Sequence, residues 1–264
     1  MGLLDDARAD PRPIDELIEI ALLEQQGGDK PITGALMALQ VRGTVEVLDA
    51  ARQLSRSPDP RRRSLACYIL RELGSPDPTF PEECCDTLLE LLAREQDIDV
   101  LSDAVYGFGF LGNRRADPAL VALSKHRDAS IRRGVACSLQ GASSAEAIQA
   151  LLELMEDGDE LARDWATTSI GEQPELDGPQ IREALWRRAG DESVFVRCSA
   201  LTGLAWRGDR RVVPRLIAEL RAASGEQAPF FHDAANAILG LPEDEALSNT
   251  AGLLKELRRS LLAT

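Results

Sequence analysis

The chain has 264 residues, 44% of them hydrophobic, and it carries a formal net charge of −14. This charge argues against broad affinity for nucleic acid or anionic membranes, because both require clustered Lys and Arg. It favours solubility and basic partners instead. A membrane-spanning helix is not predicted, because the sequence has no run of about eighteen consecutive apolar residues.

An alanine followed four residues later by an apolar residue recurs at intervals of 30 to 38 residues. The fourth copy differs from this pattern, because the polar Gln140 stands at plus four. Leu139, one place earlier, can take its role in the core. A period near thirty, with room for two helices in each copy, is typical of an α-solenoid. The alanines, each taken as position zero of its repeat, are Ala35, Ala66, Ala104, Ala136, Ala166, Ala200 and Ala234.

Each repeat is predicted to hold two antiparallel helices, because apolar residues return at helical spacing between Gly and Pro breaks. The first helices are predicted over residues 14–24, 45–55, 82–94, 118–126, 145–155, 179–188 and 211–221. The second helices are predicted over residues 31–43, 61–74, 100–112, 130–141, 160–171, 193–208 and 228–240.

The predicted fold class is all-α, since no segment alternates apolar and polar residues as a strand requires. We expect a right-handed α-solenoid of about seven antiparallel helix pairs over residues 14–240. Residues 1–13 are expected to form a loose lead-in. Residues 241–264 are expected to form a C-terminal capping helix, because a terminal repeat must meet water on one face.

Two segments carry a family resemblance, DASIRRGVA and DESVFVRCSA. An acidic start with Ile-Arg or Val-Arg before the alanine resembles the short HEAT-like repeats named after phycobilisome (bilin) lyases, over roughly residues 14–240. The resemblance implies a ladder of Asp and Arg from consecutive repeats, with a structural role for the arginines. The candidates are Asp59, Asp97, Asp128, Asp159 and Asp191 before Arg63, Leu101, Arg133, Arg163 and Arg197, where Leu101 marks a missing rung.

The second helices are expected to line the concave, binding side of the solenoid. Positions minus one, plus two and plus six face away from the first helices, and we call them the second-helix stripe. Its 21 positions hold five of the eleven aromatic residues and no Lys or Arg. The candidate binding residues on it are Tyr68, Glu72, Asp103, Tyr106, Phe110, Trp165, Glu172, Thr202, Trp206, Asp233 and Asn236.

An aromatic and acidic stripe suits a basic or partly apolar protein segment, because rings and carboxylates both attract Arg and Lys. We therefore predict a non-enzymatic interaction module: an adaptor, a client chaperone, or an inhibitor or immunity protein. The rings could equally pack between neighbouring second helices. The oligomeric state stays open.

An enzyme is the alternative. HEAT-like alkylpurine DNA glycosylases use aromatic residues and a carboxylate on a cationic face, and Arg163, Asp164 and Trp165 resemble that trio. The absence of basic residues on the stripe argues against DNA. A bilin-lyase-like activity also stays open, without a catalytic residue that can be matched.

Neither a metal site nor a cofactor is predicted, because His126 and His232 lack partners at metal-ligand spacing. The five Cys include no C-x-x-C pair, which indicates free thiols in a reducing compartment. The vicinal Cys84 and Cys85 are expected to be inert. With no signal-peptide pattern at the N-terminus, we expect a cytoplasmic protein.

Overall fold

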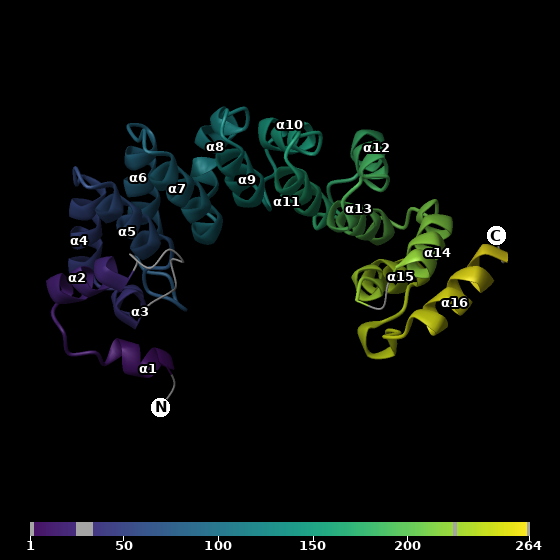
Figure 1. The fold of residues 1–264 in the computed structure, drawn as a ribbon, viewed down its shortest axis with the longest axis horizontal. Helices are drawn as coiled ribbons and strands as arrows, with labels where there is room; N and C mark the ends of the chain where they lie inside the picture. The colour runs from purple at the N-terminus through teal and green to yellow at the C-terminus, as the bar shows by residue number, and fades with distance from the viewer. Residues whose placement is uncertain (1–2, 25–33, 224–225, 263–264) are drawn as a thin grey trace. The chain divides into compact units, whose positions relative to one another are not determined.

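The computed structural model describes residues 3–24, 34–223 and 226–262, and the regular elements in these ranges are all helical (Figure 1). The all-α prediction is therefore confirmed. The chain forms two compact units, residues 1–139 (unit 1) and residues 140–264 (unit 2).

Unit 1 begins with a short helix and continues with four helix pairs in its described residues. In each pair the second helix packs on the first, and the second helices α5, α7 and α9 lie side by side. The helices are α1 (Leu3–Arg8), α2 (Ile14–Glu24), α3 (Gly34–Arg42), α4 (Val45–Ser55), α5 (Pro60–Arg71), α6 (Pro81–Leu92), α7 (Ile98–Leu111), α8 (Asp117–Leu123) and α9 (Ala129–Ser138), with a 3-10 turn η2 (Arg114–Ala116) before α8.

Unit 2 holds three further pairs and a terminal helix in its described residues. Its second helices α11, α13 and α15 lie side by side, and α16 packs on α14 and α15. The elements are α10 (Ala145–Leu154), α11 (Glu160–Gly171), α12 (Pro179–Arg188), α13 (Val194–Trp206), α14 (Val212–Ala222), η3 (Ala228–Phe231), α15 (His232–Leu239), η4 (Glu243–Glu245) and α16 (Thr250–Leu262).

Several predicted boundaries agree with the structure to the residue, namely those of α2, α4, α11 and α12. The start of the predicted helix over residues 31–43 lies outside the described residues. The loose lead-in is wrong for residues 3–8, because these form α1, which packs on α3. The segment between α1 and α2 is held by Arg42 of α3, which donates to the carbonyls of Asp10 and Arg12 at 2.6 and 2.7 Å.

Acidic residues start most of the second helices. Asp59, Asp97, Asp128 and Asp159 each accept a hydrogen bond from a backbone N–H in the first turn that follows. Such a cap satisfies a donor that has no partner within the helix and contributes about 1 kcal/mol. These carboxylates therefore act first as helix caps, which the predicted ladder did not include.

The core of each unit lies between its first and second helices. The alanines at position zero are fully or almost fully buried, and so are the apolar residues at plus four, such as Leu70 and Leu204. Each fully buried Leu contributes roughly 1.5–3 kcal/mol relative to exposure. The small side chain at position zero lets the two helices of a pair approach closely.

The fourth repeat is shifted by one residue from the predicted alignment. Arg132, rather than Arg133, donates to the carbonyls five and six residues earlier, as Arg63 and Arg197 do in their repeats. Position zero of this repeat is therefore Val135, and plus four is Leu139. With this alignment Gln140 stands at plus five, and the fourth repeat has an apolar residue at plus four like the others.

The ladder exists, but its carboxylates differ from the predicted ones. Arg163 contacts Asp191 through two hydrogen bonds of 3.1 and 3.2 Å, as expected. Arg63 instead contacts Glu95, at 2.6 and 2.9 Å. Arg197 contacts Glu219 on α14, at 3.0 and 3.3 Å, and meets Asp191 only at its backbone carbonyl.

These rungs are mostly buried, and they lower the pKa of their carboxyl groups. Burial acts to raise the pKa of Asp191, but hydrogen bonds from Arg163 and from the Ser193 amide outweigh it, and the pKa falls below its usual range. The same balance lowers the pKa of Glu95 beside Arg63. The ladder arginines therefore have the structural role that the family resemblance implied.

Two glycines bring α11 and α13 into backbone contact. A Cβ built on Gly203 would lie 2.7 Å from the Cα of Gly171, which no real side chain tolerates. Arg207, only 8% exposed, joins the same helices through all five of its N–H groups. These groups donate to the carbonyls of Ile170, Gly171, Gln173, Leu176 and Gly203.

None of the five cysteines, all of which lie in the described residues, is paired in a disulfide. Burial raises the pKa of Cys84 to about 12 and also raises the pKa of Cys85. A thiol with a raised pKa has little reactive thiolate at neutral pH.

Candidate functional site

Second-helix stripe residues contact one another between neighbouring helices. Position plus two of one repeat meets position minus one of the next. The Tyr68 hydroxyl donates to Asp103 at 3.3 Å in unit 1, and the hydroxyls of Thr168 and Ser199 are 2.9 Å apart in unit 2. The stripe is therefore partly a packing surface, which was one of the two interpretations of its rings.

Unit 1 binds an arginine of its own on the stripe. The guanidinium carbon of Arg71 lies 4.3 Å from the ring centre of Tyr68 and 4.4 Å from that of Phe110. Its Nε donates to Glu72 at 3.1 Å, and Gln40 donates to the same carboxylate oxygen at 3.2 Å. We call this arrangement the unit 1 cage.

The unit 1 cage corrects the picture of a purely acidic surface. Arg71 stands at plus five, outside the stripe positions, and its charge offsets that of Glu72. Asp103 accepts hydrogen bonds from Tyr68 and Ser64. The predicted site residues Tyr68, Glu72, Asp103 and Phe110 are thus brought together in unit 1, around a cation that the chain itself supplies.

Tyr106 lies against the next helix. A Cβ built on Gly134 would meet its ring at 3.3 Å, so the half-buried ring packs on α9 where that helix has no side chain. Gly134 stands at minus one in the corrected register. Tyr106 therefore repeats the contact between plus two and minus one.

In unit 2 the predicted rings are exposed. Trp165 on α11 is 38% exposed and Trp206 on α13 is 45% exposed. Glu172 and Asp233 are also exposed, and Thr202 is half-buried. Gln140 donates to the carboxylate of Glu172.

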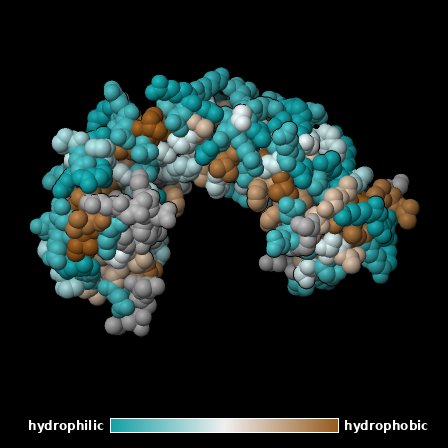
Figure 2. All heavy atoms as spheres, in the orientation of Figure 1, coloured by the Kyte–Doolittle hydropathy of each residue, from teal (hydrophilic) through white to brown (hydrophobic). Residues whose placement is uncertain are grey.

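Three exposed apolar side chains on α11, α13 and η3 were missed by the sequence reasoning. Leu161 on α11, Phe195 on α13 and Phe230 in η3 are exposed, and the rings of Phe195 and Phe230 lie 5.4 Å apart. They stand four or five residues before position zero, outside the stripe. In Figure 2 hydrophobic patches interrupt a mostly hydrophilic surface over the region of α11 and α13.

Two carboxylates accompany these side chains. Asp164 and Asp233 both lie close enough to the thiol of Cys198 to act on its pKa, which burial raises to about 11. The same thiol donates to the Phe230 carbonyl at 2.7 Å. The carboxylates of α11 and α15 thus both act on Cys198 of α13.

Asp164 is the less exposed of these carboxylates. Burial raises its pKa, while the hydrogen bond from Ser199, at 3.3 Å, acts to lower it. Arg163 directs its guanidinium to Asp191 and to the Asp157 carbonyl. The arginine of the trio that resembled a glycosylase is therefore engaged in the ladder.

Asn236 has a structural role. Its side-chain amide donates to the Leu247 carbonyl at 3.1 Å and accepts from the Leu247 amide at 2.9 Å. The His232 ring contacts the Thr250 hydroxyl at 3.1 Å. Both side chains thereby hold the segment that leads into α16.

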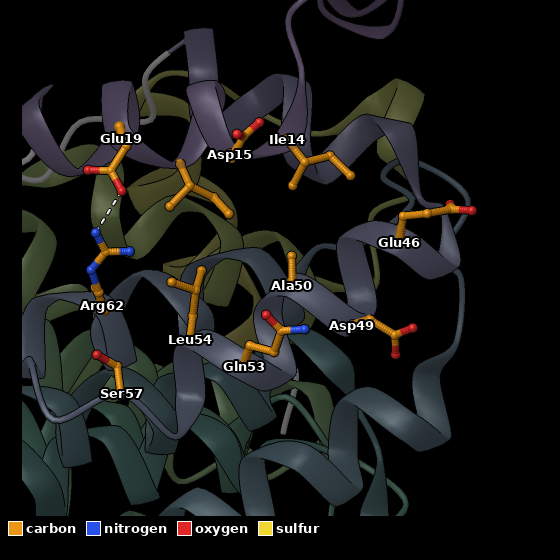
Figure 3. Close-up of a pocket in the computed structure, with 11 residues that line it drawn as sticks. Ile14, Asp15, Glu19, Glu46, Asp49, Ala50, Gln53, Leu54, Ser57 and Arg62 are labelled. Carbon is orange, nitrogen blue, oxygen red and sulfur yellow. Dashed lines mark hydrogen bonds and ion pairs between the residues drawn. The ribbon is translucent and has the colours of Figure 1, made fainter.

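Unit 1 also has a cleft of about 730 Å³ between α2, α4 and the start of α5 (Figure 3). Ile14, Ala50 and Leu54 contribute apolar side chains to it. One side is closed by the ion pair of Glu19 and Arg62, at 2.6 Å. The lining carboxylates are Asp15, Glu19, Glu46 and Asp49.

Within the described residues, no group of three or more His, Cys, Asp or Glu could hold a metal ion. Over the same part of the chain, none of the helices combines the length and the apolar character needed to cross a bilayer.

Residues 85–171 match the family described as HEAT repeats. This match agrees with helix pairs whose second helices lie side by side in each unit. The segment 85–171 is thus identified as HEAT repeats.

The chain is similar to Protein YibA of Escherichia coli, in strains K12 and O157:H7. The two share 24% identity over 217 residues, which cover 78% of this chain and 74% of YibA. The X-ray structure of YibA has a TM-score of 0.70 at 20% identity, over 98% of this chain and 96% of that one. This similarity shows a common fold.

Two further solved structures are more distant. An engineered protein has a TM-score of 0.54 at 16% identity, over 98% of this chain and 82% of its own. The complex of CpcE and CpcF of phycocyanin lyase from Nostoc sp. PCC7120 has a TM-score of 0.48 at 18% identity, over 96% of this chain and 97% of that one. A TM-score this low supports no statement about lyase activity in this chain.

Proposed function

We propose that the chain is a non-catalytic protein-binding module, and that unit 2 binds a basic, partly apolar segment of another protein. The observation that carries this proposal is the set of exposed Leu161, Trp165, Phe195 and Phe230 on neighbouring helices. Asp164 stands on α11 between Leu161 and Trp165, and Asp233 follows Phe230 by three residues. We call these four apolar side chains the apolar row.

The chemistry of the apolar row suits such a segment. Exposed aromatic side chains are frequent anchors of protein interfaces, where a few of them supply most of the binding free energy. A cation over such a ring contributes ~0.5–2 kcal/mol. The net charge of −14 also speeds the encounter with a basic partner and repels acidic ones.

Unit 2 is preferred over unit 1 for a physical reason. In unit 1 the rings of Tyr68 and Phe110 already stack on Arg71. A partner would have to displace that arginine before it could use them. An adaptor, a client chaperone, and an inhibitor or immunity protein would all use a surface like the apolar row.

A peptide selection tests the proposal without knowledge of the natural partner. A random peptide library displayed on phage is selected on the immobilised full chain, and the enriched peptides are synthesised. We expect sequences that combine Arg or Lys with apolar residues. Replacing Trp165 and Phe195 together by Ala should weaken their Kd at least about tenfold, because two interface anchors are lost.

The matched control is Val45→Ala, which removes an exposed apolar side chain from α4 in unit 1. It should leave the Kd unchanged. Enrichment of neutral or acidic peptides would contradict the proposal. Equal affinity for the wild type and the double variant would contradict the choice of the apolar row.

A further inference from the structure

The unit 1 cage shows how this repeat holds a guanidinium group. Counted from position zero, the ring of Tyr68 is at plus two, Arg71 at plus five and Glu72 at plus six. Phe110 is at plus six of the next repeat, and Gln40 at plus five of the preceding one. The arginine is stacked between two rings and hydrogen-bonded to a carboxylate, while Gln40 holds that carboxylate in place.

Unit 2 repeats the carboxylate, the glutamine and one of the two rings, but Thr168 stands at the position of Tyr68 and the arginine is missing. Glu172 stands where unit 1 has Glu72, and Gln140 donates to it as Gln40 does to Glu72. Trp206 stands at the position of Phe110. Gly171 stands at the position of Arg71 and brings no side chain to the surface.

The helix pair α5 and α7 in unit 1 and the pair α11 and α13 in unit 2 bring equivalent repeat positions into contact. In unit 1 a Cβ on Gly107 would lie 3.7 Å from the Cβ of Arg71, and in unit 2 Gly203, at the equivalent position, meets Gly171. The contact between plus two and minus one also recurs, as Tyr68 with Asp103 and Thr168 with Ser199. Equivalent positions in the two units therefore have equivalent neighbours.

The nearby Arg207 does not take the place of Arg71. Its five N–H groups donate to backbone carbonyls beneath the surface, and its side chain is almost fully buried. Glu172 and the Trp206 ring, in contrast, are exposed. Since no Arg or Lys of the described residues pairs with Glu172, we take a cation that reaches these groups to come from another molecule.

We propose that Gln140, Glu172 and Trp206 form a receptor for an arginine side chain, the unit 2 receptor. This inference rests on the proposed function, because the arginine would belong to the bound segment. Arginine is preferred to lysine because its planar guanidinium can stack on the indole and donate to the carboxylate at the same time. Gln140 fixes the carboxylate before the ligand arrives, which lowers the entropy lost on binding.

The test follows the indole N–H signal of Trp206 in the ¹⁵N-labelled full chain by NMR. The probe is Nα-acetyl-arginine amide, and Nα-acetyl-lysine amide is the matched ligand. We expect a saturable shift with the arginine probe at millimolar concentration and an affinity several-fold lower for the lysine probe. Trp186, whose ring already lies 5.2 Å from the Arg211 guanidinium, is the internal control and should not shift.

Glu172→Gln is the matched variant, because it removes the charge and keeps the size of an exposed side chain. It should weaken arginine binding at least about fivefold. Absence of a Trp206 shift, equal binding of lysine, or an unchanged affinity in Glu172→Gln would each overturn the receptor. If it fails while selected peptides still require Trp165 and Phe195, the proposed function stands and this assignment alone is wrong.

Discussion

Units 1 and 2 present a carboxylate and one aromatic ring at equivalent positions of neighbouring second helices, although Thr168 replaces the Tyr68 ring in unit 2. The difference that concerns the cation lies at plus five. Unit 1 has Arg71 there, and this arginine covers Phe110. Unit 2 has Gly171, and Trp206 remains exposed. The comparison teaches that the repeat backbone sets where a guanidinium can be held, whereas one side chain decides whether the chain itself provides it.

The two units also differ in how the same pair of helices is joined. In unit 2 the backbones of Gly171 and Gly203 meet, and Arg207 satisfies the carbonyls at the end of α11. The equivalent of Arg207 in unit 1 is Leu111, which has no donor. Unit 2 therefore depends on one buried arginine for an interface that unit 1 forms through side chains.

The largest expected effect comes from Arg207→Met. Five hydrogen bonds to carbonyls would be lost in a buried place, so we expect unit 2 to lose about 3–5 kcal/mol in its free energy of unfolding. Urea unfolding measures the loss, and hydrogen exchange should locate it in α11 and α13. Arg221→Met, at an exposed site of α14, should change stability by less than about 0.5 kcal/mol. If the free energy of unfolding fell by less than about 1 kcal/mol, or if amide hydrogen exchange rose equally in both units, the contrast between the units would be wrong.

The next effect is expected from Arg71→Ala, which makes unit 1 resemble unit 2. Loss of two ring contacts and one charged hydrogen bond should cost about 1–2 kcal/mol. The variant also opens the unit 1 cage, so Nα-acetyl-arginine amide should raise its melting temperature more than that of the wild type. The lysine analogue is the control. An equal response of wild type and variant to the arginine probe would show that the two units are not equivalent in this respect.

The smallest effect concerns pH and Asp164. Its pKa is raised in the folded chain, so the folded state holds the proton more tightly than the unfolded state. Stability from this group is therefore present below the ordinary carboxyl pKa of about 4, and it is lost as the pH rises through the folded pKa. Asp164→Asn should therefore gain in melting temperature relative to the wild type as the pH rises from 4 to 7. A constant difference across this range would contradict the shift.

Much of the fold could be predicted from sequence, because the residues that recur in each repeat are the ones that pack in the core. Gly and Pro breaks placed α4, α11 and α12 to the residue. The fourth repeat was misaligned because an alanine stands next to the true position zero, Val135. Gln140 at plus four was the signal of that error, since a polar residue does not suit a core position.

The site was harder to predict than the fold, because it depends on contacts between helices. The stripe included Glu172 and Trp206, but helical periodicity could not show that Arg71, from plus five, covers Phe110. Nor could it place Phe195 against Phe230, because these residues lie on different helices. Asn236 was counted as a binding residue, although its partner Leu247 belongs to the connection before α16. The distances between such segments are set by tertiary packing, which periodicity does not encode.

The contact between Gly171 and its neighbours has an evolutionary consequence. A single substitution at Arg71 would remove the side chain that closes the unit 1 cage. The reverse change in unit 2 is obstructed, because a Cβ on Gly171 would lie 3.1 Å from the Ser199 carbonyl oxygen. Over many generations the first surface can be opened by one substitution, while closing the second also requires the neighbouring helix to shift by a few tenths of an ångström.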